Sequence, residues 1–460
     1  MSDSKKKSSK ENSNNNEKKS NKKKIFGWII FLCLLGLGAQ IGINYLYNDS
    51  AEVNNAQTNQ LVKQDTLLKQ DTSTPTNAKF MAAVSDTTSD TSSTVVYVSR
   101  PEDVGEANFT MDQSAGKSIK RVFTGKRINI AVTGVDSRLG TSTKHADANH
   151  ILSILPDQGI IEITSIPRDT PAEAGQSDSS GQNKLTIVRA LKGREAYLKE
   201  AARIAGLDKI HYWVEAGFSQ VMGILNLLGF KDPGSALQVL RSRTALGGDD
   251  YQRCYNQGQF IRQSTLSHFN KFTGVLGELA IRGGLAFVET NLTTDIIKDI
   301  ISKLQAKNFP SSPEVVTLRV RPAMGRSFKI YDFTDNSTFV SLKSKIESVN
   351  SNKGLDSVKV VVNVAGKLNN FVNKAIQDSA KRPQNVITGL VTYYNQKAWH
   401  QVKDEAQRNK LRDQIGLLLA NAYDKKKQPD KAKAVRIAIA DEKELFSKQL
   451  FDKPKSTKVK

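Results

Sequence analysis

The strictest alternation of hydrophobic and polar residues runs along Ile160–Thr170, whose sequence is IIEITSIPRDT. Its β-branched residues in a two-residue period predict a strand rather than a helix. Pro167 cannot donate a hydrogen bond to a sheet, so we expect the strand to end there. Arg168 and Asp169 then stand at the end of a strand, where open α/β sheets usually bind their ligands. Taken alone, the same two residues are also typical of a surface ion pair.

Two further strands precede this one. Residues 128–132 alternate in the same way, residues 150–155 form a second predicted strand, and the polar segment 140–149 connects them. Because short connections join antiparallel neighbours, we expect the polar residues that flank these strands to meet at one edge of the sheet. The residues expected at that edge are Asp136, Arg138, Asp147 and Arg168.

Helical periodicity dominates the middle of the chain. Residues 184–204, 267–285 and 293–304 are amphipathic, whereas 218–228 is almost wholly apolar. A helix of this last kind is typical of a buried core, although it could also flank an apolar channel. Strands alternating with helices predict an α/β fold. Four polar residues recur near the predicted ends of elements in this stretch: Arg241, Arg243, Arg253 and Gln257.

The N-terminal quarter of the chain consists of three segments that differ in composition. Residues 1–24 are basic and polar, and we expect a disordered cytoplasmic tail. Residues 25–47 carry no charge and are long enough to cross a bilayer, while the lysines before them favour a cytoplasmic N-terminus and an extracellular remainder. Residues 48–118 are rich in Ser, Thr, Asp and Asn, which predicts an extracellular linker. We therefore expect a single-pass cell-membrane protein.

Charge and cysteine content narrow the class of protein. Lys and Arg exceed Asp and Glu by 67 − 46 = 21, which favours anionic partners. Cys33 and Cys254 would lie on opposite sides of the membrane boundary, so no internal disulfide is expected, and no Cys/His cluster has zinc spacing. The composition divides the remainder into a domain at 119–335 and a polar, mostly helical extension at 336–460.

The motifs occur in one order behind a single membrane anchor. They are Gly134-Val-Asp-Ser-Arg138, Asp147, Ser165-Ile-Pro-Arg-Asp-Thr170 and Leu240-Arg-Ser-Arg243 followed by Arg253 and Gln257. This set resembles the LytR-CpsA-Psr family of bacterial cell-wall proteins over residues 120–305. The resemblance implies an α/β/α sandwich around a central mixed sheet. It also implies a phosphotransferase that moves an anionic glycopolymer, such as teichoic acid or capsule, from a polyprenyl-pyrophosphate carrier to peptidoglycan.

The resemblance assigns roles to individual residues. Asp136 and Asp147 would hold a magnesium ion. A sugar hydroxyl would be the acceptor, and either Asp169 or Asp147 could take its proton. Guanidinium groups match the oxygens of a pyrophosphate in bidentate fashion. The residues implied to bind the pyrophosphate are Arg138, Arg168, Arg241, Arg243, Arg253 and Gln257.

The chain departs from the family pattern at five positions. It has His145-Ala-Asp-Ala148 where Arg-Ser-Asp-Thr is common, Asn256 in place of a second arginine, and Gly258 in place of a glutamine. These departures leave open a non-catalytic scaffold that binds polyprenyl phosphate or wall polymer. Transcriptional attenuation is a third alternative, but the basic surface would lie outside the cell, so no nucleic-acid partner is expected.

Overall fold

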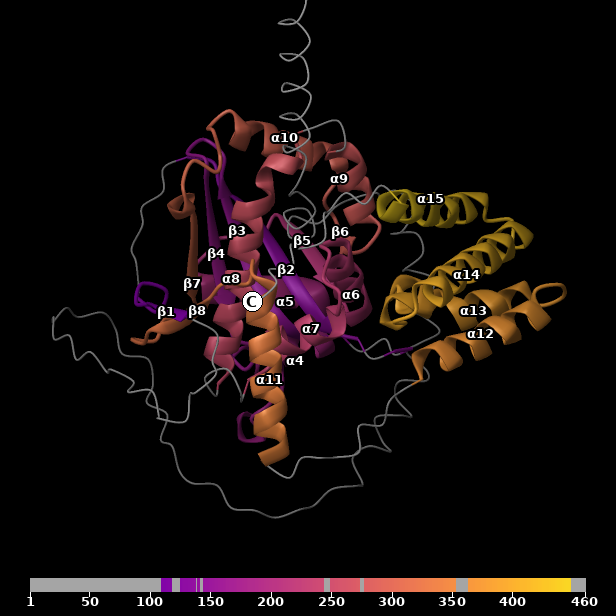
Figure 1. The fold of residues 1–460 in the computed structure, drawn as a ribbon, viewed down its shortest axis with the longest axis horizontal. Coiled ribbons are helices and arrows are strands. Elements are labelled where there is room, and N and C mark those ends of the chain that lie inside the picture. The colour runs from indigo at the N-terminus through magenta and orange to yellow at the C-terminus, as the bar shows by residue number, and fades with distance from the viewer. Residues whose placement is uncertain are drawn as a thin grey trace, which may run out of the picture. The chain divides into compact units, whose positions relative to one another are not determined.

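A six-stranded mixed sheet forms the centre of the fold (Figure 1), with the strand order β6-β5-β2-β3-β4-β7. The computed structural model describes residues 109–117, 125–137, 139–140, 144–243, 249–273, 277–352 and 363–447. The predicted tail at 1–24, the predicted membrane span at 25–47 and Arg138 lie outside them. The strands are β2 (Ile128–Asp136), β3 (His145–Leu155), β4 (Ile160–Ile166), β5 (Tyr212–Ala216), β6 (Glu289–Thr290) and β7 (Val316–Val320).

The register of the three central strands confirms the predicted antiparallel arrangement. β3 pairs antiparallel with both β2 and β4, while β5 and β7 add parallel strands on either side. A bulge at Gly134 and Val135 shifts the β2–β3 register next to Asp147. The ends of β2 and β4 and the start of β3 therefore lie at one edge of the sheet, as the strand lengths and short turns require.

Helices cover both faces of the sheet, so the core has the predicted α/β/α layers. On one face α4 (Leu185–Leu191) and α5 (Gly193–Ala205) bury Leu185, Val188 and Tyr197 against Ile151 and Ile166. The expected single helix at 184–204 is broken because Gly193 has a φ of +82°, which helical residues do not adopt. The other face carries α6 (Phe218–Leu227), α7 (Pro233–Arg241), α8 (Asp250–His268), α9 (Gly277–Leu285) and α10 (Thr294–Gln305).

The longest helix on this second face, α8, runs against β4 and β7. Its N-terminus is capped by Asp249, whose side chain accepts a hydrogen bond from the Gln252 amide. The prediction of a helix over 267–285 is wrong: α8 ends at His268 and α9 begins at Gly277, with the 3-10 helix η3 (Phe269–Lys271) after α8. Phe269 is fully buried and packs edge-on against Phe309, with 4.5 Å between the ring centroids.

Two elements extend the domain beyond its expected limits. β1 (Phe109–Asp112) lies within the stretch expected to be a linker and pairs with β8 (Phe328–Tyr331). α11 (Asn336–Asn352) lies within the stretch expected to be an extension, yet Phe339, Leu342 and Ile346 belong to the main hydrophobic core. Position 335 is therefore not a packing boundary.

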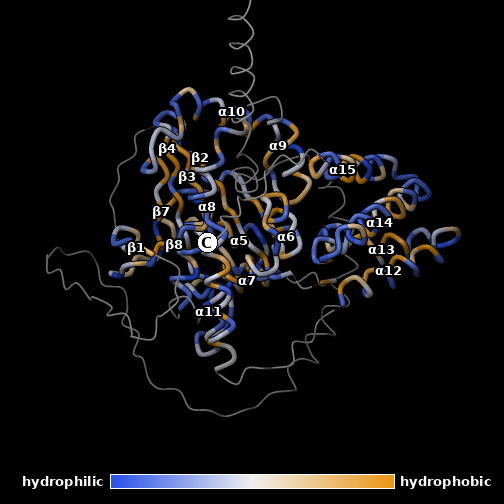
Figure 2. Tube along the Cα trace, in the orientation of Figure 1, coloured by the Kyte–Doolittle hydropathy of each residue, from blue (hydrophilic) through white to orange (hydrophobic). Residues whose placement is uncertain are grey.

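The C-terminal helices form a second core of their own around Trp399 and Leu411, shown in orange to yellow in Figure 1. Apolar positions in Figure 2 follow the strands and the inward sides of the helices. Across the described ranges, no helix combines the length and the hydrophobicity that a membrane crossing requires. The elements are α12 (Val364–Asp378), α13 (Pro383–Asn395), the 3-10 helix η5 (Ala398–Gln401), α14 (Glu405–Lys425) and α15 (Pro429–Ser447).

Candidate functional site

Arginines and aspartates from four segments meet at the edge of the sheet that the sequence singled out. Arg168, in the turn after β4, places Nη1 2.7 Å from Oδ1 of Asp147 on β3. Arg241, at the end of α7, lies 4.0 Å from the other oxygen of Asp147. These side chains border a hollow of about 560 Å³, which we call the arginine pocket. Its lining consists of Asp147, Arg168, Phe218, Met222, Gly234, Leu237, Gln238, Arg241, Ser242, Arg243, Arg253, Ile346 and Gln401.

Asp250, the first residue of α8, organises the guanidinium groups of the pocket. Its carboxylate accepts a hydrogen bond from the Arg168 amide at 3.0 Å, lies 3.3 Å from Nε of Arg243, and pairs with Arg253 one turn along the helix. An acidic side chain also suits the positive end of the α8 dipole. Asp250 is not among the site residues that the sequence predicts. An acid at the start of a helix, three residues before an arginine, was the available signal.

Arg253 is the buried cation of the pocket, with only 7% of its side chain exposed. Burial, followed by the positive charges of Arg243 and Arg168, lowers the pKa of Arg253, although Asp250 opposes this shift. Its Nε finds no hydrogen-bond partner among the described residues, and neither does Nε of Arg168. Buried donors left unpaired beside several like charges are what a bound anion would satisfy.

The other side of the arginine pocket is apolar. Phe218 and Met222 on α6 face Leu237 on α7, and Ile346 of α11 completes this side. The guanidinium of Arg241 lies 4.0 Å from the centre of the Phe218 ring, a cation–π contact that orients the arginine. The pocket therefore offers cations for an anionic group and an apolar surface for an attached hydrocarbon.

The remaining predicted residues take different places. Asp169 lies 3.2 Å from Arg243 and 3.7 Å from Lys184. Gln257 does not line the pocket; its Nε2 donates to the Leu240 carbonyl at 3.0 Å and so holds the end of α7. Most of the predicted residues are thus brought together, with Gln257 in a supporting position.

Asp136 and Asp147 were expected to hold magnesium. The register pairs Asp136 with His145, two residues before Asp147, so both carboxylates stand at the same end of β2 and β3. No cluster of three or more His, Cys, Asp or Glu side chains that could hold a metal occurs among the described residues. The donor set still fits magnesium, because this ion often binds one or two carboxylates and completes its shell with substrate phosphate and water.

Packing accounts for one departure from the family pattern, and a second departure lies outside the pocket. A side chain at Gly258 would bring its Cβ within 2.4 Å of Ser165 Oγ and 2.6 Å of Leu318, so α8 can lie this close to the sheet only with glycine there. Asn256 is buried and its side chain accepts a hydrogen bond from Gln252. It is not among the residues of the arginine pocket.

A buried histidine lies beneath the pocket. His150 on β3 is paired in register with Ser165 on β4, and its Nδ1 is 2.8 Å from Ser165 Oγ. Burial lowers the pKa of His150 to about 4, and the nearby charge of Arg253 acts in the same direction. The ring is therefore neutral at physiological pH and adds no charge under the arginines.

An ion-pair network braces the sheet beside the site. Glu215 on β5 accepts hydrogen bonds from Arg189 at 2.6 and 2.8 Å and from Arg194 at 2.8 Å. Burial opposes its ionisation, yet the two arginines hold the pKa of Glu215 at about 2. Glu289, its neighbour in register on β6, pairs with Lys144 at the entrance to β3. The network thereby anchors the strand that carries Asp147.

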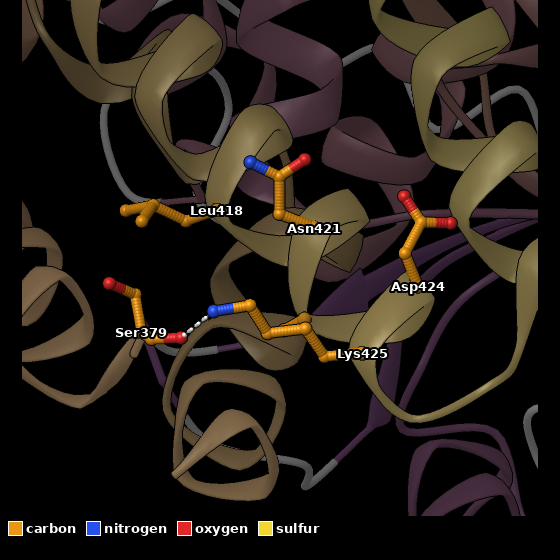
Figure 3. A pocket seen from close by; sticks show the side chains of 6 residues that line it. Ser379, Leu418, Asn421, Asp424 and Lys425 are labelled. Carbon is orange, nitrogen blue, oxygen red and sulfur yellow. Dashed lines mark hydrogen bonds between the residues drawn. The ribbon is translucent and has the colours of Figure 1, made fainter. Parts of the chain in front are cut away.

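A second hollow, of about 340 Å³, lies among the C-terminal helices and is drawn in Figure 3. Lys425 there donates to the Ser379 carbonyl at 2.7 Å, and Asp424 is paired with Arg436. Its charged groups are therefore engaged with neighbouring residues, and they do not converge on the hollow as the guanidinium groups do in the arginine pocket.

The layers and the arginine pocket define an α/β/α protein whose pocket combines guanidinium groups with an apolar surface. A model of the LytR_cpsA_psr family matches residues 86–229. The match confirms the resemblance to this family that the ordered motifs predict. Asp136, Asp147 and Arg168 fall inside the matched range, whereas the arginines of α7 and α8 follow it.

Three solved structures are each similar to about half of the chain. Protein gbs0355 from Streptococcus agalactiae is 17% identical over 48% of this chain and 87% of its own, with a TM-score of 0.34. TagV from B. subtilis is 14% identical over 49% of this chain and 98% of its own, with a TM-score of 0.33. TagT bound to LIIa-WTA is 15% identical over 50% of this chain and 95% of its own, with a TM-score of 0.30. No curated protein matches the chain.

Proposed function

We propose that this chain is a membrane-anchored phosphotransferase that attaches an anionic glycopolymer, of the teichoic acid or capsule type, to peptidoglycan. The donor would be a polyprenyl pyrophosphate that carries the polymer. One observation carries the proposal: the arginine pocket joins four guanidinium groups to an apolar surface. A lipid-linked pyrophosphate has the same two chemical parts.

The reaction is a displacement at the phosphorus that bears the polymer. A peptidoglycan hydroxyl forms the new O–P bond, the pyrophosphate P–O bond breaks, and polyprenyl phosphate leaves. Such transfers require positioning and neutralised charge on the non-bridging oxygens. Arg168, Arg243 and Arg253 would supply that charge, and Asp250 would keep their forks oriented.

The hydroxyl proton needs an acceptor. Asp147 and Asp169 are the two candidates, and each is already paired with a guanidinium, at 2.7 Å and 3.2 Å respectively. As phosphate oxygens engage the arginines, the carboxylate of either pair would be released to accept the proton. Magnesium, held by Asp136 and Asp147, would supply further neutralisation of phosphate charge.

A transfer assay tests the proposal. The full chain would be given a farnesyl-pyrophosphate-linked polymer fragment and peptidoglycan fragments, with and without EDTA. Radiolabel on the polymer fragment should pass to the peptidoglycan fragments, and Asp147→Asn should reduce the rate of this transfer. Binding of the donor without any transfer, in the presence of magnesium, would refute the catalytic role.

A binding scaffold is the second candidate. The observation in its favour is that both candidate bases, Asp147 and Asp169, are engaged by arginines. A scaffold would retain the lipid-linked donor through the same pocket but leave its pyrophosphate intact. Analysis of the bound lipid after incubation with peptidoglycan distinguishes the two functions.

The proposed location is the outer face of the cell membrane, with residues 25–47 as the single span and Lys22–Lys24 inside. Protease added to intact wall-less cells should release a large fragment. Complete protection of that fragment would refute this topology. A nucleic-acid partner is not part of the proposal.

A further inference from the structure

One residue of the arginine pocket comes from far along the chain. Gln401, the last residue of η5, lines the pocket, and its Nε2 donates to Ser219 Oγ at 2.7 Å. Ser219 is buried in the first turn of α6, next to Phe218, whose ring carries the guanidinium of Arg241. Gln401 is thus connected through two side chains to a cation of the pocket.

The same C-terminal stretch contacts the turn that follows β2. The Gly140 amide donates to Oε1 of Gln396 at 2.9 Å, and Leu139 packs against the C-terminal core. A side chain at Gly140, whose φ is +81°, would bring its Cβ within 2.8 Å of the Tyr393 hydroxyl, so the turn lies close against α13. The turn begins directly after Asp136, one of the two proposed magnesium ligands.

The stretch that makes these contacts is itself firmly buried. The Trp399 indole donates to Glu442 on α15 at 2.8 Å, and His400 lies 3.2 Å from the same carboxylate. The His400 ring also contacts Phe287 of the main core at 5.0 Å between centroids. A Cβ at Gly223 of α6 would lie 2.8 Å from this ring, so η5 rests directly on α6.

We propose that the C-terminal helical region positions the candidate site, with Gln401 forming one side of the arginine pocket and Gln396 holding the turn after β2. This inference rests on the proposed function, since it concerns the same pocket. It gives the polar, mostly helical extension predicted at 336–460 a part in the candidate site. In structural terms, α6 and the end of β2 are held from one side by the sheet and from the other by residues 393–401.

Binding of farnesyl pyrophosphate to the full chain tests the pocket contact. Gln401→Ala and Ser219→Ala should each weaken binding about two- to tenfold, the range for one neutral hydrogen bond. The double variant should bind no more weakly than the weaker single variant, because the two side chains act as one unit. Gln384→Ala is the matched control, since Gln384 is exposed on α13. Binding equal to the control in both single variants would overturn the proposal.

Amide exchange provides a readout that needs no ligand. Gln396→Ala should increase exchange at the Gly140 amide, while Gln384→Ala should not, and both should leave the melting temperature within a degree or two of the parent. Unchanged exchange at Gly140 would overturn the positioning role. If the parent chain failed to bind farnesyl pyrophosphate, the proposed function would fail, and exchange would still decide this inference.

Discussion

Substituting Arg168 with lysine separates the charge of the guanidinium from its shape. In the structure Nη1 donates to Asp147 at 2.7 Å, while Nε has no hydrogen-bond partner among the described residues. Burial lowers the pKa of Arg168, but the hydrogen bond and charge of Asp147 outweigh it and raise the pKa overall. The fork can therefore hold the carboxylate with one nitrogen and present another to a phosphate.

A lysine ammonium at position 168 would keep the ion pair with Asp147 but would lose the second contact, which the guanidinium can make to a phosphate. Removal of one transition-state donor typically costs 10²–10³-fold in rate, so kcat should fall about 100-fold, equivalent to about 2.7 kcal/mol. The effect on folding should be below about 1 kcal/mol, because the side chains of Arg168 and Asp147 are 30% and 15% exposed and water screens the pair.

The assay measures polymer transfer and melting temperature on the same preparations. Arg203→Lys is the matched control, because Arg203 pairs with Glu200 at 2.8 Å on the exposed side of α5. The control should retain full transfer. If Arg168→Lys kept at least half of the parent rate, or lost several degrees of stability while transfer per folded molecule was unchanged, Arg168 would be an ordinary structural ion pair.

Three further outcomes follow from the geometry. Asp147→Asn should shift the magnesium dependence of transfer to higher concentrations, and an unshifted titration would remove Asp147 from the metal site. Gly258→Ala should destabilise the fold by about 1–3 kcal/mol in urea, because its Cβ would lie 2.4 Å from Ser165 Oγ, whereas Gly389→Ala, with no described atom within 4 Å, should not. Because His150 has a pKa of about 4 when folded and 6.5 ordinarily, the unfolded chain binds more protons between these values. The contribution of His150 to the free energy of unfolding should therefore be fully present above pH 6.5 and should fall by up to roughly 3 kcal/mol towards pH 4. His150→Gln should flatten this profile.

The centre of the sheet could be predicted because its signals are local. The strand patterns of 128–132, 150–155 and 160–166, with short connections between, were enough to place three strands antiparallel. The meeting of Asp147 with Arg168 followed from that topology. The helix α6 was also predicted, from an apolar run whose length suits a core helix.

The contacts that were missed join segments distant in sequence. Gln401 and Ser219 are 182 residues apart, and neither has a neighbour pattern that marks a site. α11 is polar along most of its length, so only the burial of Phe339 and Leu342 reveals that it belongs to the main core. The sequence presents Gly258 only as the loss of a glutamine side chain. The close approach of α8 to the sheet explains why a glycine stands there. Periodicity reports the local environment of a residue but not which distant segment covers it.

The contribution of η5 and α15 to the main domain also has a consequence for the order of events during synthesis. A chain is made from its N-terminus, and at 5–20 residues per second the last segments arrive well after the sheet. Gln401 of the pocket and Leu445 of the main core belong to those last segments. A nascent chain that ends before residue 401 carries all four arginines but only an unfinished pocket. Completion of the arginine pocket therefore waits for segments that are made long after the sheet and the four arginines.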